Sequence, residues 1–558
     1  MDIHPLDPDL SVSPQIFASD LAAIARAGFR SVVCNRPDGE AADQPGYVEI
    51  ERAAARQGLQ ARHLPAEVCK VSDEHGRAFA ALMAELPKPV LAYCRTGMRS
   101  TTMWALAEAA SRPLPQLMER ARGAGFDLQG VVRRIANGGR TPIEVTDASH
   151  EIVIVGGGAA GIAVAASLLA RHSGLDIAII DPADVHYYQP GWTMVGAGVF
   201  GAASTARTMA SVLPAGVQWI KAGVVAFEPE RDAVILEGCR VVKYKQLVVC
   251  PGLKLDWQGV EGLAESLGRN GVTSNYRFDL APYTWRLAQE LARRRGGRAV
   301  FTQPPMPIKC AGAPQKAMYL SADHWRRCGV LKNIDIEFCN AGAALFGVAE
   351  YVPALMEYVR RYGIRLDFGH TLVAVDGAAR KATFSRKLAD GSQELVTRDF
   401  DMLHAVPPQK APDFVRASPL ADAAGWVDID PATLRHKVHA NVFALGDVGN
   451  SANAKTAAAA RKQAPVVAHN LLAACGKASG EARYDGYGSC PLTVERGKIV
   501  LAEFLYGGKV APSFPTWLID GTRPSRTAWA LKERILPPLY WKAMLKGREW
   551  MARPMLTV

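Results

Sequence analysis

The sequence predicts an α/β protein of several domains, and three observations lead to this prediction. The chain has 558 residues, too many for one hydrophobic core, so we expect two or three domains. Between Lys88 and Ala110 a buried strand, a tight loop and a helix follow one another. From Glu151 a second apolar strand runs into a glycine-rich turn and another helix. Such alternation is typical of parallel sheets covered by helices.

Composition and termini exclude several classes of protein. The apolar fraction of 49% is ordinary for a globular chain. The first residues, MDIHPLDPDLSV, contain acidic side chains and no apolar core, so we expect no export signal. Ten cysteines in such a chain do not predict a disulfide scaffold. No Cys or His pattern has the spacing of a zinc site, so the sequence predicts no metal.

The first domain is expected to span residues 1–138, followed by a linker at 139–149 that is rich in Gly, Pro, Thr and Ser. In it, "FRSVVCNRPDGE" predicts a strand that runs into a loop. Cys94 stands between a strand and a helix, where converging amides would stabilise an anion and favour a thiolate. Arg95 and Arg99 add positive charge. The alternative is a buried, inert Cys94.

Two motifs of this domain, "CNRPDGE" and "YCRTGMRS", resemble the phosphatase-fold sulfurtransferases that are often joined to sulfur-oxidising enzymes. Cysteine phosphatases have five residues between nucleophile and arginine, whereas Arg99 follows Cys94 after four and Ser100 takes the phosphatase arginine position. The loop is more similar to the rhodanese turn. The resemblance therefore implies sulfur transfer with Cys94 as nucleophile beside Arg99, and Asp38 as an acid in the phosphatase alternative.

The second region opens with a dinucleotide-binding fingerprint. Gly156, Gly158 and Gly161 follow the apolar residues Ile152–Val155, Ala159 begins the predicted helix, and Asp181 ends the next strand. The glycines permit the turn, the approach of a pyrophosphate and close helix packing, and the acid can accept from ribose hydroxyls. This pattern excludes the transmembrane interpretation that the uncharged run from Ile152 to Ala170 would otherwise suggest.

Two further motifs indicate that the nucleotide is FAD. "HANVFALGDVGNSANAKTAAAARKQA", with Gly446 and Asp447, resembles the second flavin motif of two-dinucleotide flavoproteins, and "YKQLVVCPGL" resembles the strand that leaves their FAD domain. The resemblance implies that Asp447 binds the ribityl chain and that the following helix faces the isoalloxazine ring. We expect the FAD domain at 150–255 and 426–500.

The second Rossmann-like domain, expected at 256–425, lacks a nicotinamide fingerprint. After the predicted strand Gly297–Thr302 the chain reads "QPPMPIKCAGAPQK" instead of a second glycine-rich turn. Proline has no N–H to donate, so this loop cannot hold a pyrophosphate. Cys310 stands there beside Lys309, whose charge would favour a thiolate, and Cys490 in "YDGYGSCPL" is the expected partner thiol.

Six motifs together resemble the sulfide:quinone oxidoreductases of the mitochondrial-like type, from about Glu151 to the C-terminus: "PIKCAGAPQKAMYLS", "YDGYGSCPL", "HYYQPGWTMVGAG", "LFGV", "DAAGWVDID" and "LGDVGNSANAKTAAA". The resemblance implies that hydrosulfide attacks a disulfide or trisulfide of Cys310 and Cys490, leaving a persulfide on Cys490. Sulfite, glutathione or another thiol then takes the sulfur, and FAD passes the electrons to ubiquinone. It also implies that FAD contacts Gln189, Val224, Lys455, Thr456 and Ala457.

The C-terminal segment, 501–558, is basic and apolar. Between Gly521 and Val558 eight Lys or Arg and two Glu give a balance of 8 − 2 = +6. Trp541, Met544 and Leu545 can share one helix face, which predicts either a helix on a membrane surface or a helix packed on the protein's own core. The family resemblance favours the membrane, on the cytoplasmic side of the inner membrane. No recognition motif for nucleic acid accompanies the charge.

The complete prediction is an α/β chain with three parts: a dual-specificity-phosphatase-like domain, two Rossmann-like domains of the disulfide-reductase flavoprotein fold, and a C-terminal amphipathic helical segment. A quinone-reducing NADH dehydrogenase and a phosphatase with a flavin sensor remain the alternative functions. A homodimer is compatible with the sequence. The remaining cysteines are interpreted as buried or neutral positions: Cys34, Cys69, Cys239, Cys250, Cys328, Cys339 and Cys475.

Overall fold

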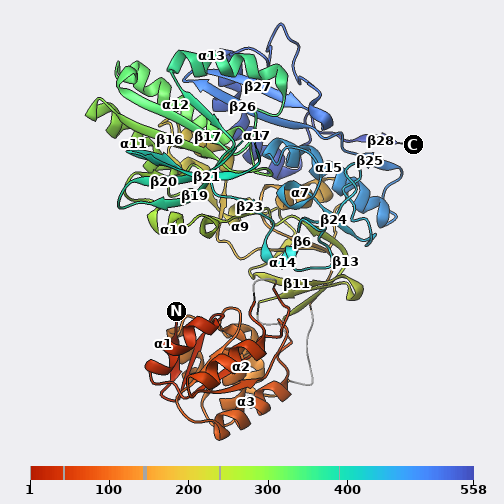
Figure 1. The fold of residues 1–558 in the computed structure, drawn as a ribbon. Coiled ribbons are helices and arrows are strands. Elements are labelled where there is room, and N and C mark those ends of the chain that lie inside the picture. Colours follow the sequence, from red (N-terminus) through yellow and green to blue (C-terminus); the bar gives the residue numbers. More distant parts are fainter. Residues whose placement is uncertain are drawn as a thin grey trace. The chain divides into compact units, whose positions relative to one another are not determined.

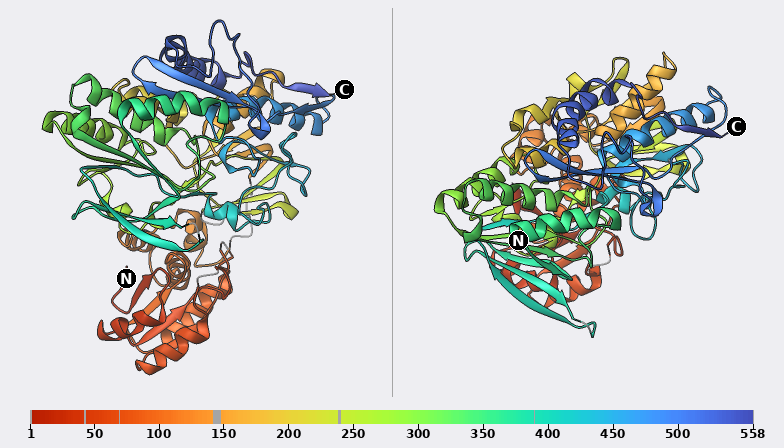
Figure 2. Two further views of the ribbon diagram at one scale, coloured as in Figure 1. Left: turned by 45° about the horizontal axis from the view of Figure 1, so that its top comes forward. Right: turned by 90° about the horizontal axis from the view of Figure 1, so that it is seen from above.

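The computed structural model of the chain describes residues 2–41, 44–68, 70–141, 148–237, 240–388 and 390–557. It divides into two compact units (Figures 1 and 2). One unit contains Met1–Ser149 with Gly223–Lys243, and the other contains His150–Ala222 with Tyr244–Val558.

The N-terminal domain is a five-stranded sheet with helices on both faces. Its strand order is β1(His4–Asp7), β2(Leu10–Ser13), β5(Val90–Tyr93), β3(Ser31–Cys34), β4(Gln60–His63), and only the β1–β2 pair is antiparallel. Its helices are α1(Leu21–Arg26), α2(Tyr47–Arg56), α3(Asp73–Glu85), α4(Met98–Glu108), α5(Leu114–Gly123) and α6(Val132–Ala136). Side chains alternate along each strand, so Val32 packs in one core and Val33 in the other. Both predicted strands of this domain are confirmed.

The larger unit begins with the predicted nucleotide-binding sheet. Strands β10(Val217–Ile220), β7(Ile177–Ile180), β6(Ala148–Val155) and β13(Val241–Val249) follow in this order, and β24(Val442–Ala444) pairs with β13 in parallel. The glycine-rich turn leads from β6 into α7(Ala159–Arg171), which packs against α15(Ala457–Ala474). The apolar run from Ile152 to Ala170 is therefore a buried strand and helix. Among the described residues, no helix is both long and apolar enough to cross a bilayer.

The second sheet of this unit is wholly parallel, with strand order β15(Val272–Thr273), β22(Met402–His404), β16(Gly297–Gln303), β17(Ile334–Asn340), β18(Arg365–Phe368). Helices α11(Ala281–Arg294), α12(Ala313–Arg327) and α13(Val352–Tyr362) contribute to its core. The predicted strand Gly297–Thr302 is confirmed as part of β16. A three-stranded antiparallel sheet follows: β19(His370–Asp376), β20(Lys381–Lys387) and β21(Gln393–Asp399).

A C-terminal hairpin, β26(Gly488–Glu495) and β27(Lys498–Phe504), packs on α12. Its apolar side chains join the core of the second sheet, where Leu492 and Val500 are fully buried. This packing brings Cys490, on β26, to the N-terminal end of α12. Two segments separated by 180 residues thus meet at one point.

The last helical segment consists of α16(Arg526–Ala530), a π-helical turn Leu531–Ile535, α17(Leu536–Lys542) and a 3₁₀ turn Met544–Lys546. The prediction that Trp541, Met544 and Leu545 face a membrane is wrong, because all three are buried. The 3₁₀ turn packs on α7, and a Cβ atom on Gly547 would lie 2.4 Å from the carbonyl oxygen of Ala166. The protein's own helix supplies the apolar surface that these side chains need.

Candidate active sites

Cys310 and Cys490 lie together, with 3.7 Å between their sulfur atoms. Cys310 follows β16 in a turn where its φ of +50° is unusual for a residue with a side chain. The backbone N–H of Cys310 donates to Lys455 O (2.8 Å), and Tyr276 Oη donates to Lys309 O (3.0 Å). These bonds fix the loop, so the first thiol is held against the second within reach of disulfide formation.

Lys316, on α12, is the lysine that contacts the thiol pair. Its Nζ donates to Cys310 Sγ at 3.2 Å. The hydrogen bond from Cys490 and the charge of Lys316 hold the pKa of Cys310 well below its usual range, and the same thiol–thiol bond raises the pKa of Cys490. Lys309, which the sequence predicts for this role, donates its Nζ to Gln189 Oε1 (2.6 Å) and interacts with Cys310 through its charge, without a hydrogen bond to the sulfur.

Lys532 is a second lysine near the pair, and the sequence pattern did not single it out. It lies in the π-helical turn, only 4% exposed, and its Nζ donates to Pro190 O (3.3 Å). Burial, and then the charge of Lys316, lower the pKa of Lys532 to about 7. Lys532 is one of many basic residues in the C-terminal segment, and no sequence motif distinguishes it. Only the folded structure shows that it lies near the thiols.

The N-terminus of α12, where a nicotinamide pyrophosphate would otherwise bind, is filled by protein. A Cβ atom on Gly312, the N-cap of α12, would lie 2.3 Å from Leu492 Cδ2 and 2.5 Å from Cys490 Sγ. A sulfur atom and a leucine side chain therefore pack directly against the N-cap of the helix. This packing agrees with the prediction that the proline-containing loop holds no phosphate.

The glycine-rich turn after β6 fits a dinucleotide. Gly156 has φ +110°, and a Cβ atom on Gly161 would lie 1.9 Å from Gly156 O, so both positions require glycine. Gly158 has open space around the position of its missing Cβ, which leaves room for a phosphate at the start of α7, where Ala159 is the first residue. Asp181 Oδ2 accepts from Gly157 N–H (2.6 Å) at the end of β7.

The second predicted flavin motif forms a tight corner before α15. Gly446 has φ +75°, and its N–H donates to Gln463 Oε1 (2.8 Å). Burial raises the pKa of the neighbouring Asp447 and lowers that of Lys455 to about 8. Lys455 Nζ donates to the carbonyl oxygens of Asp447 and Gly449, at 2.7 and 2.8 Å.

Three other residues predicted to contact FAD have these positions. Thr456 caps α15 by accepting from Ala459 N–H (3.2 Å), and Ala457 is the first residue of that helix. Val224 is half-buried at the start of β11(Val224–Glu228).

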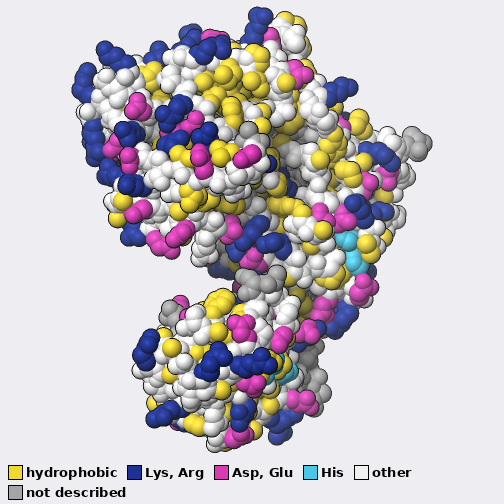
Figure 3. All heavy atoms as spheres, in the orientation of Figure 1, with side chains coloured by type: hydrophobic (Ala, Val, Ile, Leu, Met, Phe, Trp, Pro, Cys, Tyr) yellow, Lys and Arg dark blue, Asp and Glu magenta, His cyan; other side chains and the backbone are white. Residues whose placement is uncertain are grey.

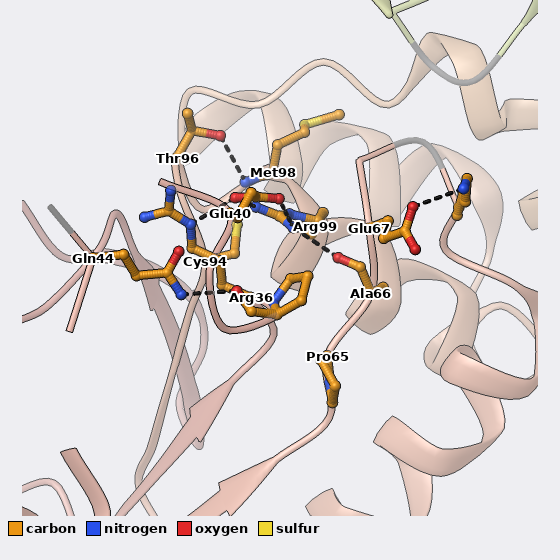
Figure 4. A network of polar contacts seen from close by, with 12 residues as sticks. Arg36, Glu40, Gln44, Pro65, Ala66, Glu67, Cys94, Thr96, Met98 and Arg99 are labelled. Atoms are coloured by element: carbon orange, nitrogen blue, oxygen red, sulfur yellow. Dashed lines mark hydrogen bonds and ion pairs between the residues drawn. The ribbon is translucent and has the colours of Figure 1, made fainter. Parts of the chain in front are cut away.

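Cys94 forms a separate site in the N-terminal domain. It is 1% exposed, directly after β5, and Gly97 N–H donates to its Sγ (3.2 Å). Arg99 Nη1 donates to Ala66 O (2.7 Å), and both of its terminal nitrogens donate to Glu40, which sequence analysis did not name (Figure 4). Asp38 is exposed and accepts from Tyr47 N–H (2.8 Å), so it caps α2.

Five of the remaining cysteines have these environments. Cys34, Cys250 and Cys339 are buried, Cys475 is half-buried, and Cys328 is exposed. Burial raises the pKa of the Cys250 thiol, which lies behind the glycine-rich turn. Cys69 and Cys239 lie outside the described residues.

One group of side chains, Glu337, Cys339 and Asp367, is close enough to share a cation. Glu337 forms ion pairs with Arg365 and Arg398. These arginines already balance the carboxylates, so the group is explained as an ion-pair cluster.

Comparisons with known proteins match both parts of the chain. Residues 150–287 match the family model "Pyridine nucleotide-disulphide oxidoreductase", and residues 2–111 match "Beta-lactamase hydrolase-like protein, phosphatase-like domain". A Dictyostelium discoideum protein named "Sulfide:quinone oxidoreductase, mitochondrial" is 40% identical over 405 residues, which cover 72% of this chain and 87% of that protein.

Two further comparisons describe the separate parts. The beta-lactamase hydrolase-like protein of Agrobacterium fabrum is 31% identical over 126 residues, which cover 22% of this chain and 29% of that protein. The crystal structure of the sulfide:quinone oxidoreductase from Aquifex aeolicus has a TM-score of 0.59 at 18% identity and covers 72% of this chain and 92% of its own. At this identity the likeness shows the fold.

Proposed function

The chain belongs to the sulfide:quinone oxidoreductase family, and we propose that Cys310 and Cys490 oxidise sulfide to sulfane sulfur and pass the electrons through FAD to ubiquinone. The observation that carries the proposal is the pair itself: two sulfur atoms 3.7 Å apart with Lys316 Nζ 3.2 Å from one of them. An isolated thiol could bind sulfide but could not return two electrons by forming a disulfide.

The two thiols have different roles in this reaction. Hydrosulfide attacks Cys490 Sγ of the disulfide, the S–S bond breaks, and Cys310 leaves as the thiolate. Lys316 supports this direction because its ammonium group stabilises the negative charge on Cys310. Sulfite, glutathione or another thiol then removes the outer sulfur from Cys490, and the two thiolates re-form the disulfide with release of two electrons.

FAD would be held by Gly156, Gly158, Gly161 and Asp181 at one end and by Gly446 and Asp447 at the other. Bound FAD accepts the two electrons and returns them to a quinone. Lys309, which is hydrogen-bonded to Gln189, and Lys455, which is bonded to Asp447 O, connect the cysteine loop to the FAD residues. These hydrogen bonds support a flavin site next to the cysteine loop.

Anaerobic addition of sulfide, with flavin absorbance as the readout, tests this proposal. We expect sulfide to bleach the oxidised flavin band and a soluble ubiquinone analogue to restore it. If sulfide leaves the band unchanged while NADH bleaches it, the protein is an NADH dehydrogenase instead.

The access of ubiquinone requires contact with a membrane, and we propose that the C-terminal region binds its surface, on the cytoplasmic side of the inner membrane. The exposed apolar side chains of this region include Trp517 (83% exposed), Leu518 and Ile535. Arg523 and Arg534 are also strongly exposed. Figure 3 shows basic side chains on the surface of the larger unit close to apolar patches. Apolar anchors flanked by cations are typical of proteins that lie on a bilayer.

For the N-terminal domain we propose sulfur transfer at Cys94. Gly97 N–H at 3.2 Å from the sulfur, at the start of α4, supports an anionic sulfur there. Treatment with glutathione persulfide should leave an additional sulfur atom on Cys94, detected by mass spectrometry. Rapid hydrolysis of an aryl phosphate without such labelling would favour the phosphatase alternative.

A further inference from the structure

A half-buried carboxylate, that of Glu40, lies among the positive groups of the Cys94 loop. Arg99 Nη1 and Nη2 donate to its two oxygens, each at 2.8 Å, and Arg36 Nε donates to Oε2 at 2.6 Å. Figure 4 shows the carboxylate between the two guanidinium groups, beside Cys94. The forked donors of Arg99, which would otherwise bind two oxygens of an oxyanion, are therefore occupied by Glu40.

The three ion-paired groups are partly shielded from water. The side chains of Glu40, Arg99 and Arg36 are 17%, 8% and 5% exposed. Although burial opposes ionisation, the hydrogen bonds from Arg99 and Arg36 lower the pKa of Glu40, and Glu40 in turn raises the pKa of Arg99. Two cations and one anion leave a single positive charge among the groups shielded from water, since Arg95, the other cation of the loop, is exposed.

The loop itself is built to receive an anion. Gly97 N–H points at Cys94 Sγ from the N-cap of α4, an eleven-residue helix. The hydroxyl of Ser100 is fully buried and has no hydrogen-bond partner among the described residues. An unpaired buried hydroxyl indicates that a partner is missing from the loop.

We propose that Glu40 makes the Cys94 loop selective for persulfides over doubly charged oxyanions such as phosphate esters and thiosulfate. The inference rests on the proposed sulfur transfer and specifies its substrate class. A persulfide group carries at most one negative charge, whereas a phosphate ester carries nearly two at neutral pH. With one net positive charge left, a second negative charge on the ligand has no buried partner.

The chemical step needs no external oxidant. The Cys94 thiolate attacks the outer sulfur of a persulfide R–S–SH, and a new S–S bond forms on Cys94 as the old one breaks. The leaving R–S⁻ thiolate takes the electron pair of the broken bond. When a small thiol takes the outer sulfur from Cys490, it becomes a persulfide, and this persulfide would be such a donor.

Measurement of anion binding to the full chain tests the selectivity without requiring sulfur transfer. In a Cys94→Ser background, calorimetry compares inorganic phosphate, a dianion at pH 8, with thiocyanate, a monoanion. We expect Glu40→Gln to increase the affinity for phosphate about tenfold relative to that for thiocyanate. Arg36→Gln should decrease the affinity for phosphate by a similar factor, because each substitution changes the local charge by one. Glu67→Gln, at an exposed carboxylate paired with Lys70, is the matched control and should leave the ratio unchanged.

The two substitutions are expected to change the affinity for phosphate in opposite directions, which distinguishes a charge effect from a structural effect. Weaker or unchanged phosphate binding in Glu40→Gln, in a variant that melts at the wild-type temperature, would overturn the proposal. Should Glu40→Gln fail to fold, unchanged phosphate binding in Arg36→Gln would overturn it equally. Absence of sulfur labelling on Cys94 with the ratio still shifted would refute sulfur transfer and leave the charge selectivity intact.

Discussion

At the scale of single residues, the function depends on an asymmetry between two thiols. Cys310 is held as a thiolate by Cys490 and Lys316, whereas the pKa of Cys490 is raised. A low pKa makes Cys310 the better leaving group, so in the proposed reaction an incoming sulfide displaces it and bonds to Cys490. The proposed order of events follows from this difference.

Replacement of either thiol should abolish sulfide oxidation. We expect Cys310→Ser and Cys490→Ser to lower the rate of flavin reduction by sulfide by about three orders of magnitude, because no disulfide can form. Both variants should still bind flavin, as their absorbance spectra will show. Cys328→Ser, at an exposed cysteine, should keep full activity. Substantial turnover without one of the paired thiols would refute the mechanism.

Lys316→Met should raise the pH at which Cys310 becomes reactive. The wild-type thiolate persists well below the usual thiol pKa, and loss of the cation should move the midpoint of iodoacetamide labelling of the reduced protein upward by about one unit or more. Labelling at low pH is thus lost while labelling at high pH remains. Lys309→Met removes a cation that is bonded to Gln189 and interacts with Cys310 by charge alone, so it should shift the midpoint less than Lys316→Met does; an equal shift would contradict the assignment.

The folded-state charge of Cys310 also predicts how stability depends on pH. The pKa of Cys310 is lower in the folded protein than in the unfolded chain, so its contribution to stability is present above the unfolded pKa and is lost as pH falls through the folded value. Urea unfolding of the reduced protein should therefore show a larger stability difference between wild type and Lys316→Met at alkaline pH than at acidic pH. The opposite trend would mean that Cys310 is a neutral thiol.

At the scale of elements, α12 shows how a nucleotide-binding site becomes a thiol site. Its N-terminus is covered by β26, with Cys490 Sγ and Leu492 against Gly312. Gly312→Val should separate the two elements, destabilise the protein by about 1–3 kcal/mol in urea unfolding, and prevent the Cys310–Cys490 disulfide. Gly347→Ala, where the added Cβ has open space, is the control. A disulfide that forms normally in Gly312→Val would show that this packing is not needed.

The sequence predicts motifs well and their partners poorly. The strand, turn and helix of the first fingerprint, the strand before Cys310 and the flavoprotein family are confirmed, because local spacing determines them. Lys316 lies only six residues after Cys310, but the sequence does not show that α12 turns its ammonium group onto the thiol. Lys532 comes from the C-terminal segment, and no local pattern marks it. For the same reason the sequence favours a membrane contact for Trp541, although His186, Tyr188 and Arg207 pack against it in the folded protein.

At the scale of the whole molecule, one chain combines a sulfide-oxidising flavoprotein with a phosphatase-like domain. If exposed C-terminal side chains hold the protein on a bilayer, Trp517→Ser with Leu518→Ser should reduce cosedimentation with anionic vesicles several-fold and keep activity with a soluble quinone. Leu395→Ser, at an exposed apolar residue of β21, should bind vesicles as wild type does. Undiminished binding of the double variant would place the membrane contact elsewhere.

The central claim is that sulfur from sulfide resides on Cys490 while Cys310 leaves. The most direct measurement is rapid acid quenching after anaerobic addition of one equivalent of sulfide, followed by alkylation and peptide mass spectrometry. The account predicts an additional sulfur atom on the Cys490 peptide. Cys310 should be alkylated directly on its own sulfur, with no additional sulfur atom. An additional sulfur on Cys310 with Cys490 unmodified, or flavin reduction with neither peptide labelled, would contradict it.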